Sequence, residues 1–298
     1  MQVTLKNRDT RTEVSGSEAP ARLYIQSALT LTSLVVAFWP ILAGMYGSWF
    51  DEHADMEHGI LVIPAVVYMV FTKMPTLRKI AVVPSKWGVV LLIWGAMQGI
   101  LGSAAQWVWV SRTAVLVSTI GCILAIFGPG ILRELTYPVA TLLLMVTPPT
   151  FVYERLTLWL QLLSSRLGEM SLELFGYSVF REGNILQLVG IRLSVEEACS
   201  GMRSLFSILF MCVLYNFFFV RSTSMKWLIL ITAVPIAILG NAGRILATGV
   251  VSQYDANLVR GTAHEAFGYV SVVIAGIGCV CVHIAAVYLQ RSWRSHHA

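Results

Sequence analysis

The stretch WLILITAVPIAILGNAGRILAT, residues 227–248, decides the fold of this 298-residue chain. It contains a single charged residue, Arg244. It is also long enough to cross a bilayer as a helix, which takes about 20 mostly apolar residues. The whole chain is 56% hydrophobic and 12% charged, whereas about a quarter of the residues of a soluble domain are charged. The composition therefore predicts an all-α polytopic membrane protein.

Eight stretches are apolar enough to form transmembrane helices. They cover residues 24–46, 58–73, 87–104, 109–128, 131–147, 200–220, 227–248 and 266–290. We therefore expect about eight spans in one integral membrane domain, residues 24–291, with a cytoplasmic tail at each end, residues 1–23 and 292–298. The N-terminal tail is polar and lacks the apolar core of a secretory signal, so we expect it to be retained.

Basic residues predict the orientation. With the N-terminus inside, 13 of the 21 Lys and Arg residues fall in cytoplasmic segments. These are Lys6, Arg8, Arg11, Arg22, Lys73, Arg78, Lys79, Lys86, Arg133, Arg221, Lys226, Arg291 and Arg294. Because Lys and Arg gather on the cytoplasmic side, this bias predicts a multi-pass protein of the cytoplasmic (inner) membrane with both termini inside. The positive charge thus reflects topology and does not indicate nucleic-acid binding.

One substantial region, about residues 148–198, is expected on the outer side. Leucines at positions 156, 160, 163 and 167 recur every three or four residues, which is typical of a helix lying in the membrane interface. Short alternating runs around Gly183-Asn184 and Gly190 predict one or two short strands. We therefore expect a small cap of one interfacial helix and short strands, whose sheet edge could pair with an extended peptide.

Three residues from consecutive spans are predicted at one level of the membrane. Counted from the cytoplasmic ends of their helices, Cys199 lies 22 residues away, Arg244 lies 18 and His264 lies 27. At about 1.5 Å per helical residue these separations are roughly 33, 27 and 40 Å, against about 30 Å for the hydrocarbon core. All three are therefore expected near the outer surface. A thiolate nucleophile, a cation for the oxyanion and an imidazole for proton transfer are the parts of thiol-based acyl transfer.

Neighbouring residues are secondary candidates. They are Arg203, Asn241, Ser200 and His58. Arg203 follows Cys199 by one helical turn, so either Arg203 or Arg244 could be the guanidinium nearer to the thiolate. The other four cysteines lie within predicted spans, so Cys199 has no apparent disulfide partner.

The acidic segment DEHADMEH, residues 51–58, raises the question of a metal site. Its two histidines, His53 and His58, are five residues apart and match no zinc spacing. No nucleotide, haem or zinc motif occurs elsewhere in the chain. We therefore expect neither a cofactor nor a metal.

These residues resemble the exosortase/archaeosortase family, the integral membrane cysteine transpeptidases of prokaryotes. The markers of that family are a Cys-Ser-Gly box opening one span, an Asn-x-x-Arg box late in the next and a His heading the last. Here they read ACSGMRS (198–204), NAGR (241–244) and HEAFGY (264–269), and DMEHGILVIP (55–64) is similar to the family's Asp-to-His-Gly segment. The likeness covers about residues 24–291, and the histidine in the third box is typical of the bacterial exosortase branch.

The resemblance implies that Cys199 is the nucleophile, Arg244 the arginine of the transition state and His264 the third site residue. It also implies substrate proteins with a C-terminal sorting signal, which is a short motif such as Pro-Glu-Pro, a transmembrane helix and a basic tail. Cleavage would take place at the outer face, facing the periplasm or outside, and membrane lipids would be the other partner. Bacterial systems of this family commonly accompany exopolysaccharide production.

Two alternatives remain open at the level of sequence. One is a non-peptidase membrane enzyme of exopolysaccharide assembly that uses Arg244 and His264. The other is a transporter or assembly subunit without catalysis. Replacement of Cys199 discriminates between the peptidase and both alternatives, because only the peptidase depends on the thiol.

Overall fold

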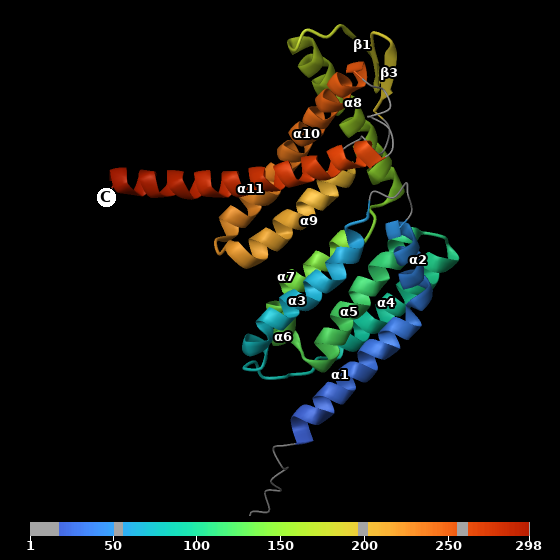
Figure 1. Ribbon diagram of the computed structural model, residues 1–298. Coiled ribbons are helices and arrows are strands. Elements are labelled where there is room, and N and C mark those ends of the chain that lie inside the picture. Colours follow the sequence, from blue (N-terminus) through green and yellow to red (C-terminus); the bar gives the residue numbers. More distant parts are fainter. Residues whose placement is uncertain (1–17, 51–55, 196–201, 255–261, 298) are drawn as a thin grey trace, which may run out of the picture. The chain divides into compact units, whose positions relative to one another are not determined.

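The structure is a computed structural model that describes residues 18–50, 56–195, 202–254 and 262–297 (Figure 1). It divides into two compact units, Met1–Trp39 and Pro40–Ala298, and the first contains helix α1 (Glu18–Ala37). The longer helices that follow are α2 (Trp39–Phe50), α3 (Gly59–Leu77), α4 (Lys86–Ala104), α5 (Val108–Ile126), α8 (Thr150–Leu174), α9 (Met202–Phe219), α10 (Thr223–Tyr254) and α11 (Thr262–His297). The shorter elements are α6 (Pro129–Glu134), α7 (Thr136–Thr141), the 3-10 helix η1 (Leu142–Met145) and the strands β1 (Val179–Glu182), β2 (Ile185–Leu188) and β3 (Ile191–Ser194).

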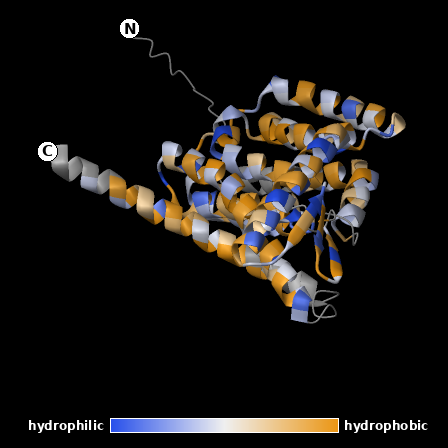
Figure 2. Cartoon of the chain, turned by 90° about the horizontal axis from the view of Figure 1, so that it is seen from above, coloured by the Kyte–Doolittle hydropathy of each residue, from blue (hydrophilic) through white to orange (hydrophobic). Residues whose placement is uncertain are grey.

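Six helices of the described chain are long and apolar enough to cross a membrane. They are α3, α4, α5, α9, α10 and the part of α11 from Val272 to Leu289. Hydrophobic residues cover most of the helical ribbon (Figure 2). Only 11% to 39% of the residues in these apolar windows are buried inside the protein. The remaining side chains face outward, where the hydrocarbon of a bilayer is their natural solvent. The prediction of an all-α polytopic membrane protein is confirmed.

The described residues form fewer spans than the eight that the sequence predicts. The first predicted span, 24–46, is interrupted between α1 and α2, and the total is seven only if this pair counts as one broken span. The fifth, 131–147, is divided into α6, α7 and η1. Proline explains this division: the ring of Pro138 clashes with the carbonyl four residues earlier in a continuous helix, and that residue is Glu134, where α6 ends.

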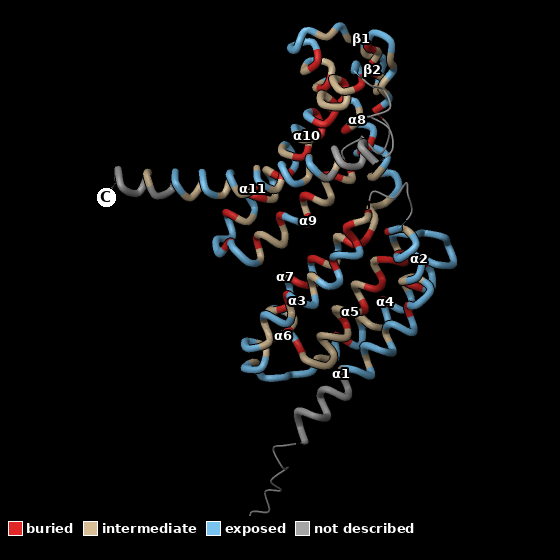
Figure 3. The backbone as a smooth tube through the Cα atoms, in the orientation of Figure 1, coloured by how far each residue is buried: buried red, intermediate tan, exposed pale blue. Residues whose placement is uncertain are grey.

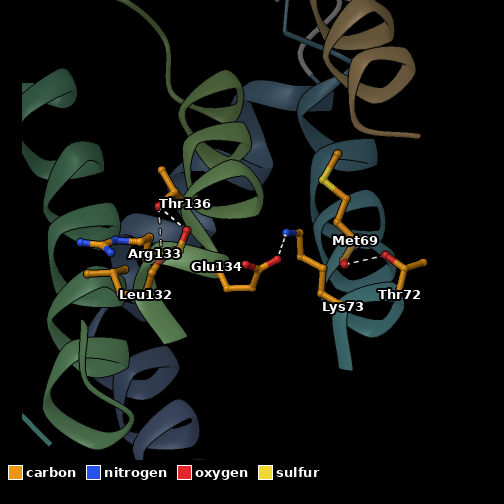
Figure 4. A network of polar contacts seen from close by, with 7 residues as sticks. All are labelled: Met69, Thr72, Lys73, Leu132, Arg133, Glu134 and Thr136. Carbon is orange, nitrogen blue, oxygen red and sulfur yellow. Dashed lines mark hydrogen bonds and ion pairs between the residues drawn. The ribbon is translucent and has the colours of Figure 1, made fainter. Parts of the chain in front are cut away.

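An ion pair joins α6 to the C-terminal end of α3. Lys73 of α3 pairs with Glu134 (Figure 4). The same ammonium group lies 5.8 Å from the ring centroid of Phe217 in α9. The hydroxyl of Thr136 donates back to the carbonyls of the preceding turn, which stabilises the junction between α6 and α7. The pair therefore fixes the broken helical segment against a full span.

Glycines on α4 allow that helix to pack closely on α5. Gly88, Gly95 and Gly102 recur every seven residues, and all three are buried. A Cβ atom at Gly102 would lie 2.6 Å from the backbone nitrogen of Ser111, and one at Gly95 would overlap the hydroxyl of Ser118. Small residues of this kind let the backbones of membrane helices approach each other. The two helices therefore form a tight antiparallel hairpin.

The predicted cap consists of α8 and a three-stranded antiparallel sheet in the order β1-β2-β3. Its turns use Gly183 and Gly190, whose φ angles of 63° and 80° are reached at little cost by glycine alone. The sheet has three strands where the sequence predicts one or two. One face of α8 and one face of the sheet pack on α10, and Figure 3 marks buried residues along both helices. The shared core contains Leu172, Leu186, Leu188, Val195 and Ile245.

Candidate active site

Arg244 lies in the second half of α10 and only 8% of it is exposed. Its guanidinium lies against α11 at Gly268, where a Cβ atom would be 3.5 Å from Cζ and 3.6 Å from each terminal nitrogen. The absence of a side chain at Gly268 therefore makes room for the guanidinium. An arginine buried in a membrane span is costly and typically functional, so this is the strongest structural feature of the site.

His264 lies on α11, four residues before Gly268. Residues four apart share a helix face, about one turn of 5.4 Å from each other. The backbone of α11 therefore places His264 one helical turn before Gly268, the residue that meets Arg244. That the two residues share one level of the membrane stays a prediction from the sequence.

Asn241 lies one turn before Arg244, and only 1% of it is exposed. Its side-chain nitrogen donates a hydrogen bond to the hydroxyl of Ser164 in α8, at 2.9 Å. On the other side of Arg244, Ile245 packs into the core of the cap. At Gly168 of α8, a Cβ atom would be 2.5 Å from the side chain of Ile245. The cap therefore fixes the part of α10 that carries the arginine, and the structure gives Asn241 a positioning contact.

Cys199 and Ser200 lie outside the described residues. The described residues that flank them are both buried, Val195 at the end of the sheet and Met202 at the start of α9. Two hydrogen bonds hold Val195 to Asn184. The N–H of Val195 donates to the backbone carbonyl of Asn184, and the side-chain amide of Asn184 donates to the backbone carbonyl of Val195. Val195 also belongs to the same core as Ile245. The segment leading to the cysteine and the helix carrying the arginine thus share one hydrophobic core.

Arg203, the other candidate guanidinium, is in the first turn of α9. Its Nη1 atom lies 2.9 Å from a carboxylate oxygen of Glu57. This partner of Arg203 was not predicted from the sequence. The available signal was the acidic residue directly before His58, in the segment that resembles a family marker.

His58 is buried at the start of α3. Its Nε2 atom lies 3.0 Å from the carbonyl oxygen of Leu144, and its ring stacks on Phe206 of α9 with 5.8 Å between centroids. Burial lowers the pKa of His58 below its ordinary value, and the hydrogen bond to Leu144 opposes this only in part. Burial therefore favours the neutral form of the ring, which joins the start of α3 to η1 and α9.

Arg112 is a second buried arginine, and no sequence motif indicated it. It lies near the start of α5, where its two terminal nitrogens donate to the hydroxyl of Thr147 at 2.7 Å and to the carbonyl of Gly44 at 3.3 Å. A charged residue inside the apolar run 109–128 was the available signal. Its contacts join α2, α5 and the segment before α8, so its role is structural.

An apolar cavity of about 420 Å³ lies beside Arg244, between α10 and α11. Small residues of α10 and apolar residues of α11 line it, among them Gly240, Gly243, Ala247, Val270 and Ile274. Within the described ranges, no group of three or more His, Cys, Asp and Glu residues could hold a metal ion. Asp51, His53 and Asp55 of the acidic segment fall outside these ranges.

The fold and this site define a class of protein, a polytopic α-helical membrane protein with a small cap, in which a buried arginine meets a helix that carries a histidine. The family model of the transmembrane exosortases (Exosortase_EpsH) matches residues 49–281. This match covers well over half of the chain, and the protein belongs to the transmembrane exosortase family. No curated protein and no solved structure matches the chain.

Proposed function

We propose that the protein is a membrane cysteine transpeptidase that cleaves C-terminal sorting signals at the outer face of the cytoplasmic membrane. The observation that carries the proposal is the contact between the Arg244 guanidinium and Gly268, one turn from His264. The contact brings Arg244 against the helix that carries His264, and the family resemblance assigns both of these residues to catalysis. The third, Cys199, follows a strand whose end shares a core with α10.

The proposed reaction has two halves. The thiolate of Cys199 attacks the carbonyl carbon of the scissile peptide bond, and the charge that develops on the carbonyl oxygen is stabilised by Arg244. The carbon–nitrogen bond then breaks, the leaving amine takes a proton from His264, and a thioester to Cys199 remains. An amine or a water molecule attacks the thioester, gives its proton to His264 and releases the thiolate.

The membrane geometry suits a substrate anchored by its own helix. Such a helix lies in the bilayer beside the spans of the enzyme, with its basic end in the cytoplasm. The short motif before the helix then emerges at the outer surface, at the level predicted for Cys199. The substrate class thus follows from the location of the proposed site and from the family, and a soluble peptide lacking the helix should be a poor substrate.

The decisive experiment is the variant Cys199→Ala, with Cys281→Ala as the matched control. Cys281 is an exposed free cysteine of α11 within a span. We expect Cys199→Ala to insert normally and to lose at least about 10³-fold of the cleavage rate, as is typical for loss of a nucleophile. Cys281→Ala should cleave like the unchanged protein. Normal cleavage by Cys199→Ala would contradict the proposal and would favour one of the two alternatives that do not use a thiol.

A further inference from the structure

Glu57 and Arg203 form an ion pair between two parts of the chain that are far apart in sequence. The carboxylate oxygen of Glu57 is 2.9 Å from Nη1 of Arg203, and the two side chains are 41% and 29% exposed. Glu57 precedes α3, whereas Arg203 is the second residue of α9. The pair therefore connects the start of α3 to the first turn of α9.

The residues on either side of Glu57 are held firmly. Met56 is 2% exposed and packs with residues of α2, α3 and α9. His58 is fixed by its hydrogen bond to Leu144 and by its stack on Phe206. At Gly59 a Cβ atom would overlap the indole ring of Trp49, so the chain runs close under that ring. Glu57 is thus a carboxylate presented from a rigid support.

Arg203, the partner of Glu57, lies close to the proposed nucleophile in sequence. Arg203 comes four residues after Cys199, and the residue before it, Met202, is fully buried where α9 begins. A half-exposed ion pair contributes little to the stability of a protein. A contact at this location can nevertheless fix the direction in which the first turn of a helix leaves the membrane surface, and catalysis is sensitive to errors of about 1 Å in such placement.

We propose that Glu57 and Arg203 are a positioning pair: the carboxylate holds the first turn of α9, and with it the segment that carries Cys199, against the start of α3. This inference rests on the proposed function. It assigns Arg203 to the pair with Glu57 and leaves the oxyanion to Arg244, whose guanidinium faces α11. Neither member of the pair takes part in the chemistry.

The test is a double-mutant cycle with charge exchange. The variants are Glu57→Gln, Arg203→Gln, their combination, and the exchanged pair Glu57→Arg with Arg203→Glu. The probe is a membrane-anchored fusion protein with a Pro-Glu-Pro motif, an apolar helix and a basic tail. We expect each single variant to lower kcat about 10-fold with KM within about twofold, because the nucleophile is misplaced while substrate binding persists. The combination should be no worse than either single variant.

Recovery of kcat in the exchanged pair distinguishes a loss of positioning from a general loss of folded protein. We expect it to regain kcat to within about threefold of the unchanged protein, since an ion pair of the reverse polarity can hold the same two elements. The matched control is Glu169→Gln, which breaks the Arg181–Glu169 pair of the cap, where the atoms are 2.8 Å apart and the exposure is similar. It should leave kcat unchanged. Single variants with normal kcat, or additive losses without recovery on exchange, overturn the proposal.

A second measurement keeps this test separate from the test of the proposed function. The rate at which a membrane-impermeant maleimide alkylates Cys199 is measured in the same variants, with Cys199→Ala as the blank. We expect the rate to change at least about threefold in the single variants and to return on charge exchange. If Cys199→Ala still cleaves the fusion protein, the proposed function fails while this measurement still decides the positioning pair. An alkylation rate that is equal in all variants overturns the pair, whatever the outcome for cleavage.

Discussion

Gly268 offers the sharpest test of the contact between α10 and α11. A Cβ atom at this position would lie 3.5 Å from the guanidinium carbon of Arg244, which is ordinary van der Waals contact. Alanine therefore fits. A further side-chain carbon extends about 1.5 Å beyond Cβ, so a leucine directed at the guanidinium forces it away by a similar distance. A displacement of about 1 Å can cost about 100-fold in rate, which corresponds to roughly 2.7 kcal/mol of transition-state stabilisation.

We therefore expect Gly268→Ala to keep kcat within about threefold and Gly268→Leu to lose about 100-fold, with KM little changed. The assay is steady-state cleavage of the membrane-anchored fusion protein, with thermal unfolding in detergent as the check on folding. Gly278→Leu is the control on the same helix, because a Cβ atom there meets Ile236, 3.4 Å away, and not the arginine. Full activity of Gly268→Leu, or equal losses for alanine and leucine, would refute the reasoning.

Three further predictions concern the folded state. Ser164→Ala removes one partner of the buried amide of Asn241, and the free energy of unfolding should fall by about 1–3 kcal/mol in a denaturant titration. Gly95→Val drives a side chain into α5 and should cost about 1–3 kcal/mol, whereas Gly47→Ala, which meets nothing within 4 Å, should be neutral by the same measurement. Because burial lowers the pKa of His58 from 6.5, its folded form binds fewer protons than the unfolded chain. The contribution of His58 to the free energy of unfolding is thus fully present above about pH 6.5, and it is lost as the pH decreases towards the folded-state pKa. His58→Phe should remove this component from a series of Tm values between about pH 5 and 8, and an unchanged pH dependence would contradict it.

The sequence predicted the membrane class well because long apolar runs are a strong signal. Spans such as α4, α5 and α10 begin or end within a few residues of their predicted limits. The segment 131–147 was predicted as one continuous span, but it is broken. Hydropathy is averaged over a window and does not report where the backbone of a helix is interrupted. Pro138 alone carried that information, and its effect depends on the carbonyl it meets four residues earlier.

The site could be predicted only in part. Sequence spacing gives the position of a residue along a helix, but it does not give the neighbouring helix that its side chain meets. The levels of Arg244 and His264 came from counting residues and stay predictions, whereas the contact between Arg244 and Gly268 could not be predicted from spacing. The pairing of Glu57 with Arg203 could not be predicted, since it depends on how α3 and α9 lie side by side. The same holds for Asn241, whose partner Ser164 belongs to a helix that the sequence assigned to the membrane interface.

The core shared by the sheet and α10 bears on the order in which the protein is made. Val195 precedes Ile245 by 50 residues, so the strands are synthesised well before the helix that covers them. Leu172 of α8 covers part of the apolar face of the sheet, and Ile245 completes this core only once α10 has been inserted. The arginine arrives in the same step, one residue earlier in the chain. A nascent chain halted before that step therefore has neither a finished cap nor Arg244.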